Sequence, residues 1–244
     1  MVRPLAVGDV STLTVGGTLD TRTYQQLRDE VIKAALDGPR RVVVDVSRLT
    51  VPAASAWAVF TSARWHVSRW PEVAIVLVCD DPATRRTIAQ NGIARFVPVY
   101  SSIEAATETL AHDASPLYRH RVRAHFPATN ASVSHCRDMV EDFLAAWSQK
   151  GLISVSKVIV TAFVENVLQH TDSRPNVRLE TDGNTVAVAV EDSSAAPALF
   201  REAQMASDHP TGLRIVNALS RAWGNTPTPE GKIIWAIVGP ENRL

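Results

Sequence analysis

Three residues in the second half of the chain are of the types that bind a magnesium nucleotide. Asn166 lies in the run SKVIVTAFVENVLQH (156–170), where an i, i+3, i+4 apolar pattern predicts a helix and another apolar residue at this position. Asp192 ends the strand-like run VAVAVED, and Gly212 opens the helix-like run GLRIVNAL. An amide oxygen can ligate Mg²⁺, a carboxylate can accept a hydrogen bond from adenine, and a glycine at a helix start lets backbone amides approach phosphate. The three residues together predict a nucleotide site beside a sheet.

Each of these residues also has a structural interpretation. A lone asparagine on a helix is commonly a satisfied core or rim residue, and an aspartate after a strand is commonly a turn residue. His170, at the end of the same helix, is expected to interact with the helix dipole. Lys232 and Arg214 could reach a phosphate, but we expect them to be exposed cations with no specific role.

The order and spacing of these motifs resemble a known family. Residues 126–238 are similar to the GHKL ATPase superfamily, and specifically to anti-sigma-factor serine kinases, in ENVLQHT, VEDSSAAP, PTGLRIVNALSRAWG and GKIIWAIV. The resemblance implies a Bergerat-type α/β sandwich that binds ATP and Mg²⁺. It implies that Asn166 binds the metal, that Asp192 binds adenine, and that Gly212 and Leu213 contact the nucleotide.

The chain departs from this family at the position of the general base. The family's kinases carry a glutamate one helical turn before the magnesium asparagine, and here that residue is Ala162. An alanine cannot accept a proton, so base catalysis worth about 10² to 10⁴-fold is lost unless another group supplies it. Glu165 is a poor substitute, because neighbouring residues on a helix do not share a face. The segment therefore favours ATP binding over ATP chemistry.

The glycines of the family's boxes are also replaced. Ser194 and Ala196 follow Asp192 where two glycines are usual, and Pro210 or Thr211 replaces the glycine before Gly212. Side chains at places where backbone should approach a ligand can narrow the site or weaken nucleotide binding.

The first half of the chain offers one candidate hydroxyl and no catalytic set. Asp45 lies in an apolar run, where a carboxylate commonly orders the following loop through backbone amides. That loop leads to Ser55, in the expected first turn of a helix, where the dipole and free amides would stabilise a phosphate. The alternative is that Ser55 is a small packing residue in an alanine-rich turn.

This half resembles a STAS domain, the fold of anti-sigma-factor antagonists. The similar segments are GGTLDTRTYQQLRDEV, VVVDVSRLTVPAASAWAVF, AIVLVCDD and GIARFVPVYSS. The resemblance implies that Ser55 is the serine that a partner kinase phosphorylates. The aspartate, serine and glycine expected around it are replaced by Ala53, Ala54 and Ala56. The target hydroxyl is thus present in a changed context.

The expected elements form two α/β domains. The first, residues 1–111, alternates strands and helices in parallel β-α-β units, with strands at 5–7, 12–15, 42–46, 74–78 and 96–100 and helices at 20–37, 54–67, 82–90 and 102–110. A linker is expected at 112–123. The second domain, 124–244, is expected to place helices on one face of a mainly antiparallel sheet, with strands at 122–126, 177–180, 185–192 and 231–238 and helices at 133–149, 155–170 and 212–223.

Composition narrows the class of protein. The 244 residues hold 25 Lys plus Arg and 25 Asp plus Glu, so no net field recruits nucleic acid or anionic lipid. The two cysteines lack metal-ligand spacing. No apolar run approaches the ~20 residues of a membrane span, and the N-terminus lacks signal-peptide features. We expect a soluble cytoplasmic protein.

Three hypotheses remain open from the sequence. The first is an ATP-binding regulator of a sigma-factor partner-switching pathway, whose partners are a sigma factor or a STAS or anti-sigma protein. In this hypothesis the two domains are expected to contact each other within one chain or across a dimer. The second is an active serine kinase that phosphorylates Ser55 or a partner STAS domain. The third is an interaction scaffold that binds no nucleotide.

Overall fold

The chain folds into two compact units, Met1–Ser115 and Pro116–Leu244. The computed structural model describes residues 2–7, 10–39, 41–112, 120–193 and 212–244. It describes the side chains of all these residues except 2–7 and 110–112. The division falls inside the expected linker 112–123, of which 113–119 lie outside the described residues. The first strand of the second unit begins at His120, so the end of the expected linker is strand instead.

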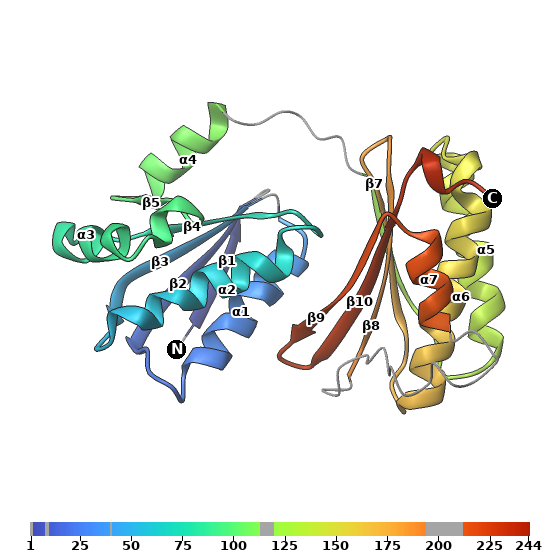
Figure 1. Ribbon diagram of the computed structural model, residues 1–244, viewed down its shortest axis with the longest axis horizontal. Helices are drawn as coiled ribbons and strands as arrows, with labels where there is room; N and C mark the ends of the chain where they lie inside the picture. Colours follow the sequence, from blue (N-terminus) through green and yellow to red (C-terminus); the bar gives the residue numbers. More distant parts are fainter. Residues whose placement is uncertain (1, 8–9, 40, 113–119, 194–211) are drawn as a thin grey trace. The chain divides into compact units, whose positions relative to one another are not determined.

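The first unit has a five-stranded sheet in the order β1-β2-β3-β4-β5 (Figure 1). The pair β1–β2 is antiparallel and the other pairs are parallel. Its elements in chain order are β1 (Val2–Val7), β2 (Val10–Thr18), α1 (Tyr24–Leu36), β3 (Arg41–Thr50), η1 (Ala54–Trp57), α2 (Ala58–Val67), β4 (Ala74–Val78), α3 (Pro82–Gln90), η2 (Ile93–Arg95), β5 (Val99–Tyr100) and α4 (Ile103–His112).

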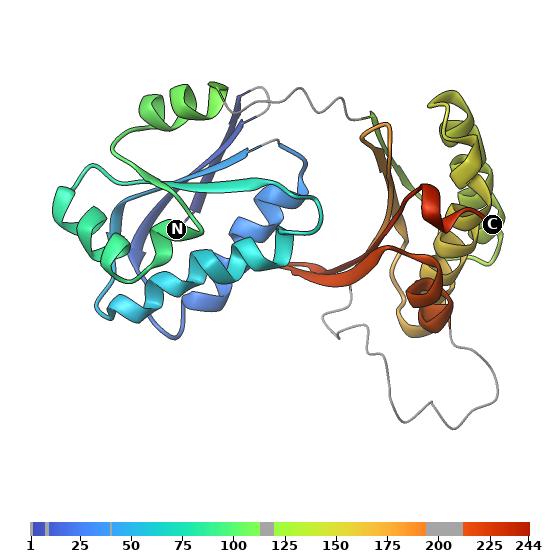
Figure 2. The ribbon, with the colours of Figure 1, turned by 45° about the horizontal axis from the view of Figure 1, so that its top comes forward.

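Helices cover both faces of this sheet. The helices α1 and α2 pack together on one face, and α4 covers the other, where Ala106 contacts the buried valines Val43, Val76 and Val78 (Figures 1 and 2). Strands covered on both sides can be apolar without alternation, as the runs in β3 and β4 are. The parallel β-α-β architecture predicted for this half is therefore confirmed.

The second unit has a five-stranded antiparallel sheet in the order β6-β7-β8-β10-β9. Its described elements are β6 (His120–His125), α5 (Ala131–Ala146), η3 (Lys150–Leu152), α6 (Ile153–His170), β7 (Asn176–Thr181), β8 (Val186–Asp192), α7 (Gly212–Leu219), β9 (Ala222–Thr228), β10 (Gly231–Val238) and η5 (Pro240–Asn242). The helices α5, α6 and α7 lie on one face of this sheet (Figures 1 and 2). The expected arrangement of helices on one face of an antiparallel sheet is confirmed.

Three expected elements have different bounds. The helix expected at 212–223 ends at Leu219, because the Arg221 amide already donates to the Ile237 carbonyl of β10 (N···O 2.8 Å). The strand expected at 96–100 is shortened to Val99–Tyr100, because Ile93–Arg95 forms a 3₁₀ turn. The helix expected at 133–149 runs from Ala131 to Ala146.

The central helix of the second unit is α6. The stretch Lys150–His170, which contains it, is long and apolar enough to cross a membrane, with a mean hydropathy of 1.6. The sequence prediction that no run reaches this length was therefore wrong. The buried residues of α6, among them Ile159, Phe163 and Val167, belong to the core that the helices form with the sheet. This burial is that of a core helix and is consistent with a soluble protein.

Candidate functional site

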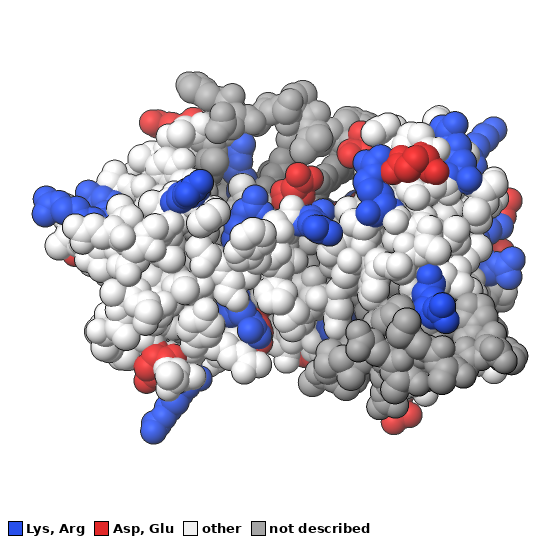
Figure 3. All heavy atoms as spheres, in the orientation of Figure 1, with Lys and Arg blue, Asp and Glu red and all other residues white. Residues whose placement is uncertain are grey.

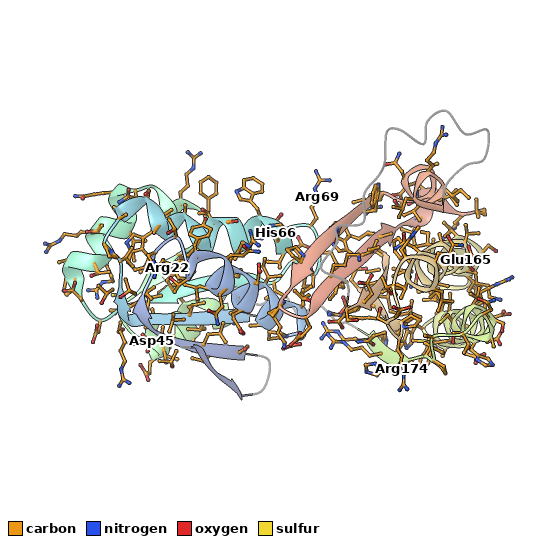
Figure 4. All side chains as sticks on the ribbon, turned by 90° about the horizontal axis from the view of Figure 1, so that it is seen from below. Arg22, Asp45, His66, Arg69, Glu165 and Arg174 are labelled. Carbon is orange, nitrogen blue, oxygen red and sulfur yellow. The ribbon has the colours of Figure 1, made fainter. Side chains whose placement is uncertain are left out.

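The amide of Asn166 lies on the rim of the core of the second unit. Asn166 is half-buried on α6, and its side chain has no hydrogen-bond partner among the described residues. Its neighbour Glu165, labelled in Figure 4, is exposed. The two side chains thus lie in different surroundings, as their spacing on the helix predicts. An amide oxygen in this position can accept from solvent or bind a cation.

The carboxylate of Asp192 is engaged in a buried ion pair. Asp192 ends β8, two residues after Val190 and four after Val188. Alternate residues of a strand share a face, so its side chain lies on the same side of the sheet as these core valines, toward the helices. Lys232 lies directly opposite it on β10, and its Nζ donates to Asp192 Oδ1 at 3.0 Å. The exposed fractions of the two side chains are 0% for Asp192 and 6% for Lys232.

This pair corrects one sequence expectation. Lys232 was expected to be an exposed cation, but it is buried, because its strand places it on the core-facing side next to a carboxylate. A buried charge is stable only when it is paired, and Lys232 supplies that pairing for Asp192. Arg214, the other expected cation, is exposed on α7.

Backbone packing holds the two ends of the pair in place. Gly231 precedes Lys232, and a Cβ at Gly231 would lie 2.0 Å from the Asp192 carbonyl oxygen and 2.7 Å from Ser193 Cα. No side chain fits in that space, so the glycine is required for β10 to approach the end of β8. The close approach of the two backbones fixes the position of the Lys232 backbone relative to the end of β8.

Gly212 lies against Ala162. A Cβ at Gly212 would be 3.2 Å from Ala162 Cβ, which is tighter than ordinary van der Waals contact. The start of α7 therefore packs on α6 at the position where a kinase of the resembled family carries its glutamate. Ala162 is 8% exposed, so a longer, charged side chain there would be buried against α7. Leu213 is buried in the same core.

The residues predicted to bind a nucleotide lie where the helix layer of the second unit meets its sheet. Asn166 is one helical turn beyond Ala162, and Ala162 contacts Gly212. The helix α6 also packs on β8 and β10, the strands of the Asp192–Lys232 pair. The glycine replacements at Ser194, Ala196, Pro210 and Thr211 lie outside the described residues.

The described part of the chain holds no group of three His, Cys, Asp or Glu side chains that could bind a metal. Asn166 is the one side chain that the sequence predicts to touch a magnesium ion. Such an ion would keep most of its coordination from water and phosphate oxygens, as Mg²⁺ commonly does.

Ser55 is exposed at the beginning of the α2 helix in the first unit. It lies in η1, which continues directly into α2, and the N-cap residue Ala53 makes no side-chain capping hydrogen bond. The first-turn amides of this helix are thus not capped by that side chain, which favours a negative group there. The position is accessible and suits a phosphorylated hydroxyl.

Asp45 shapes the strand before this loop. It lies within β3, as expected, and β3 continues to Thr50 past an irregularity in its pairing with β2. The Ser47 amide donates to Asp45 Oδ1 at 3.0 Å, within that irregularity. Ser47 Oγ in turn accepts from the Asp80 amide at 3.2 Å, after β4. The carboxylate orders the backbone, as predicted, and has no direct part in a site.

Comparisons with known proteins bear on the first unit. Residues 5–106 match the family model of the STAS domain. The first unit is a STAS domain. A crystal structure of an anti-sigma factor antagonist from Mycobacterium paratuberculosis matches with 21% identity over 46% of this chain and 93% of that chain, at a TM-score of 0.40. The anti-sigma factor antagonist SpoIIAA in its unphosphorylated form matches with 15% identity over 46% and 97%, at a TM-score of 0.38. The comparison with curated proteins gives no match.

The STAS domain presents an exposed aromatic pair next to α2. Trp65 is 69% exposed and Phe96 is 50% exposed, and their ring centroids are 6.4 Å apart. The Arg95 guanidinium carbon lies 5.8 Å from the centre of the Phe96 ring. Large exposed rings beside an arginine are the composition of binding hot spots.

This pair continues a line of accessible residues that starts at Ser55. Ala58, Ser62, Trp65 and Arg69 follow Ser55 in steps of three or four residues, and none of the five is buried. Ala58, Ser62 and Trp65 have the spacing of one side of α2, whereas Ser55 lies in the 3₁₀ turn before that helix and Arg69 follows its end. Sequence reasoning missed this line, although the spacing of Trp65 from Ser55 could have indicated it.

Sequence reasoning also missed Lys232. The signal was available in the alternation of β8 and β10, which gives Asp192 and Lys232 the same core-facing side. What the alternation could not give was the register that places them opposite each other.

Proposed function

We propose that this protein is a regulator in a sigma-factor partner-switching pathway, and that its STAS domain docks a protein partner through the surface around Ser55. The observation that carries the proposal is the exposed hydroxyl of Ser55 at a helix start within a STAS domain. A phosphate added there would carry a charge near −2 and would alter a docking surface by repulsion and desolvation. The partner is a sigma factor, an anti-sigma protein or another STAS protein, and we expect the encounter in the cytoplasm.

The line from Ser55 to Arg69 supports this proposal. Trp65 and Phe96 supply apolar area, and Arg69 is an exposed cation one turn beyond Trp65. Small residues at Ala58 and Ser62 allow a partner backbone to approach α2 between the hydroxyl and the rings. One partner can therefore contact the phosphorylation site and the aromatic anchor together.

The test uses four versions of the full chain isolated from the cells that produce it. These are the wild type, S55A, S55E and S134E, the last of which adds the same charge at an exposed serine of α5. Mass spectrometry should find phosphate on Ser55, and S55E should lose the sigma-pathway partner that S55A and S134E retain. An unmodified Ser55 together with equal partner recovery by S55A and S55E would contradict the proposal.

ATP binding by the second unit is a second candidate function. The supporting observation is the half-buried Asn166 amide, which has no partner among the described residues and lies one turn from the start of α7. The kinase alternative has less support, because Ala162 offers no base and packs against Gly212. Incubating the purified chain with labelled ATP and Mg²⁺ tests it, and label on Ser55 that disappears in N166A would establish phosphoryl transfer by this unit.

A further inference from the structure

The exposed aromatic pair of the STAS domain lies among cations that have no acidic partner within the described chain. Arg69, labelled in Figure 4, is exposed just beyond the end of α2, four residues after Trp65. Arg95 is exposed in η2, and its guanidinium carbon lies 5.8 Å from the centre of the Phe96 ring. Neither arginine forms an ion pair with any residue that the structure describes. Their charges are therefore available to a ligand that covers the rings.

The elements around this aromatic pair carry positive charge and no negative charge. Residues 46–71, which include η1 and α2, contain no aspartate or glutamate, and neither do residues 82–103, which include α3 and η2. The two segments pack together, since α2 contacts η2 and α3 contacts both η1 and η2. Their arginines are Arg48, Arg64, Arg69, Arg85, Arg86 and Arg95. The chain has no net charge, so this local excess of cations is compensated elsewhere in the molecule.

The acids that border these segments leave most of this charge unbalanced. Glu72 follows the first segment and Asp81 precedes the second. The Asp81 side chain accepts from first-turn amides of α3, and Arg85 donates to the carbonyls of residues 79 and 80, so these two groups act within the fold. The exposed arginines of the surface are Arg69, Arg86 and Arg95. A ligand that matches this surface is therefore anionic.

The aromatic pair supplies the apolar half of the contact. A partner side chain that covers the rings of Trp65 and Phe96 removes apolar area from water. The residues before Trp65 on the same side of α2, Ala58 and Ser62, are small, so a partner backbone can lie against the helix there. Carboxylates next to such an apolar anchor can pair with the exposed arginines, because a guanidinium group binds a carboxylate through two parallel hydrogen bonds.

A protein segment fits this surface better than a nucleic acid does. Nucleic acids bind mainly by the neutralisation of several phosphates, and the net charge of a protein attracts them. This chain has no net charge. A short acidic segment needs only an apolar side chain for the rings and carboxylates for the arginines beside them.

We propose that the STAS domain binds an acidic amphipathic segment of its protein partner, with an apolar side chain on Trp65 and Phe96 and carboxylates on Arg69 and Arg95. This inference rests on the proposed function, which assigns a protein partner to this surface, and it names the chemistry of that partner. It also gives phosphorylation of Ser55 a direction. A partner that covers both Ser55 and the rings brings negative charge near the phosphate, and like charges repel, so the unphosphorylated form binds it.

The test titrates the full chain with fluorescein-labelled peptides and measures fluorescence anisotropy. Each peptide is an alanine-rich helix with a central tryptophan, and glutamate, glutamine or lysine stands three and four residues to either side, where it shares the face of the tryptophan. We expect the glutamate peptide to bind wild type at least about tenfold more tightly than the glutamine peptide, because charge-assisted hydrogen bonds are stronger than neutral ones. The lysine peptide should bind most weakly.

Three variants of the full chain separate the charges from the rings. R69E/R95E should remove the advantage of the glutamate peptide and favour the lysine peptide. R137E/R174E is the matched control, because it makes the same change of net charge at two exposed arginines of the second unit, and it should bind like wild type. W65A should weaken the glutamate and glutamine peptides by the same factor, since it removes apolar contact and no charge. If near-ultraviolet circular dichroism shows R69E/R95E to be unfolded, R69Q/R95Q replaces it and should bind the glutamate and glutamine peptides equally.

Several results would overturn the inference. Equal binding of the glutamate and glutamine peptides by wild type is one, and an unchanged preference in R69E/R95E is another. Absence of binding by the glutamate peptide is a third. Tighter binding of a fluorescein-labelled uridine-rich RNA, or of vesicles of phosphatidylcholine and phosphatidylglycerol, would assign the surface to another class of anion.

The Ser55 experiment decides the proposed function separately. Selective binding of the glutamate peptide together with an unmodified Ser55 would support the acidic partner and remove phosphorylation as the switch. Phosphate on Ser55 and loss of the partner by S55E, without selectivity among the peptides, would keep the proposed function and overturn the acidic partner.

Discussion

Ser55 follows β3, the central strand of the STAS domain, and Asp192 ends β8, the central strand of the second unit, but their surroundings are opposite. Ser55 is exposed on a helix start that its N-cap side chain leaves open, whereas Asp192 is buried and paired with Lys232. The first group is accessible to another protein. The second is paired through one of its oxygens with a lysine of the same sheet. Basic and acidic side chains are interspersed on the face drawn in Figure 3, so recognition at either unit depends on local groups and not on net charge.

The two buried cysteines give each unit its own reporter for this comparison. Burial raises the pKa of Cys136 in α5 to about 12 and also raises the pKa of Cys79 after β4. A raised pKa keeps the thiol protonated, so at pH 8 the thiolate fraction of Cys136 is about 1,000-fold below that of a free cysteine. We expect iodoacetamide to label neither thiol in the folded chain, and mass spectrometry measures each site. Rapid labelling of Cys136 without denaturant would contradict the burial of α5.

Removing one member of the buried pair should have the largest effect on stability. K232M leaves Asp192 buried without its ammonium, and we expect a loss of about 3–5 kcal/mol in the unfolding free energy of the second unit. Urea titration with pulsed labelling of Cys136 measures this loss, and Cys79 should keep its wild-type profile.

The double variant D192N/K232M sharpens this prediction. It removes both charges with little change of volume, so it should recover most of the stability that K232M loses. If single and double variants were equally unstable, the pair would not be what holds the end of the sheet.

A charged side chain at Ala162 should have the next largest effect. A162E must place a carboxylate between α6 and α7, where Gly212 is already in close contact, and we expect a loss of about 1–3 kcal/mol. The control is A146E, at an exposed alanine that ends α5. Urea denaturation compares the two. If A162E were as stable as the wild type, α7 could move away from α6 at little cost in free energy. The glutamate of the resembled family could then be restored at position 162.

A charge at Ser55 should have the smallest effect on folding. Ser55 is exposed, so S55E should change the stability of the STAS domain by no more than about 0.5 kcal/mol. The readout is the urea midpoint for labelling of Cys79. A larger loss would mean that Ser55 packs against its neighbours in the 3₁₀ turn, which is the structural alternative. Ser55 and Asp192 would then both be held by contacts within their own units.

The sequence predicted those elements whose signals are local. The strand Ala74–Val78 and the helix Pro82–Gln90 have the expected bounds. That helix begins with a capping Asp81, whose side chain accepts from the Ala83 and Thr84 amides, and it ends before Gly92 at φ +74°. Such caps are properties of neighbouring residues, so a sequence displays them.

The features that depend on distant residues were not predicted. The length of β3 depends on its pairing with β2 and β4, and the end of α7 depends on the Arg221–Ile237 hydrogen bond of the sheet. The Asp192–Lys232 pair depends on the register of two strands that are 40 residues apart in the chain, with α7 and β9 between them. Asn166, Asp192 and Gly212 were identified by type and order, but the groups that contact them were set by tertiary packing.

The composition of α6 has a consequence for the synthesis of the chain. Ile153–His170 is made before the strands β7, β8 and β10, whose Leu179, Val188 and Ile234 later cover it. Until β10 has left the ribosome, the part of this apolar surface that Ile234 covers stays exposed. A nascent or truncated chain that ends before Gly231 would be a substrate for chaperones and proteases. Completion of β10 is therefore required for the second unit to fold before it is bound or degraded.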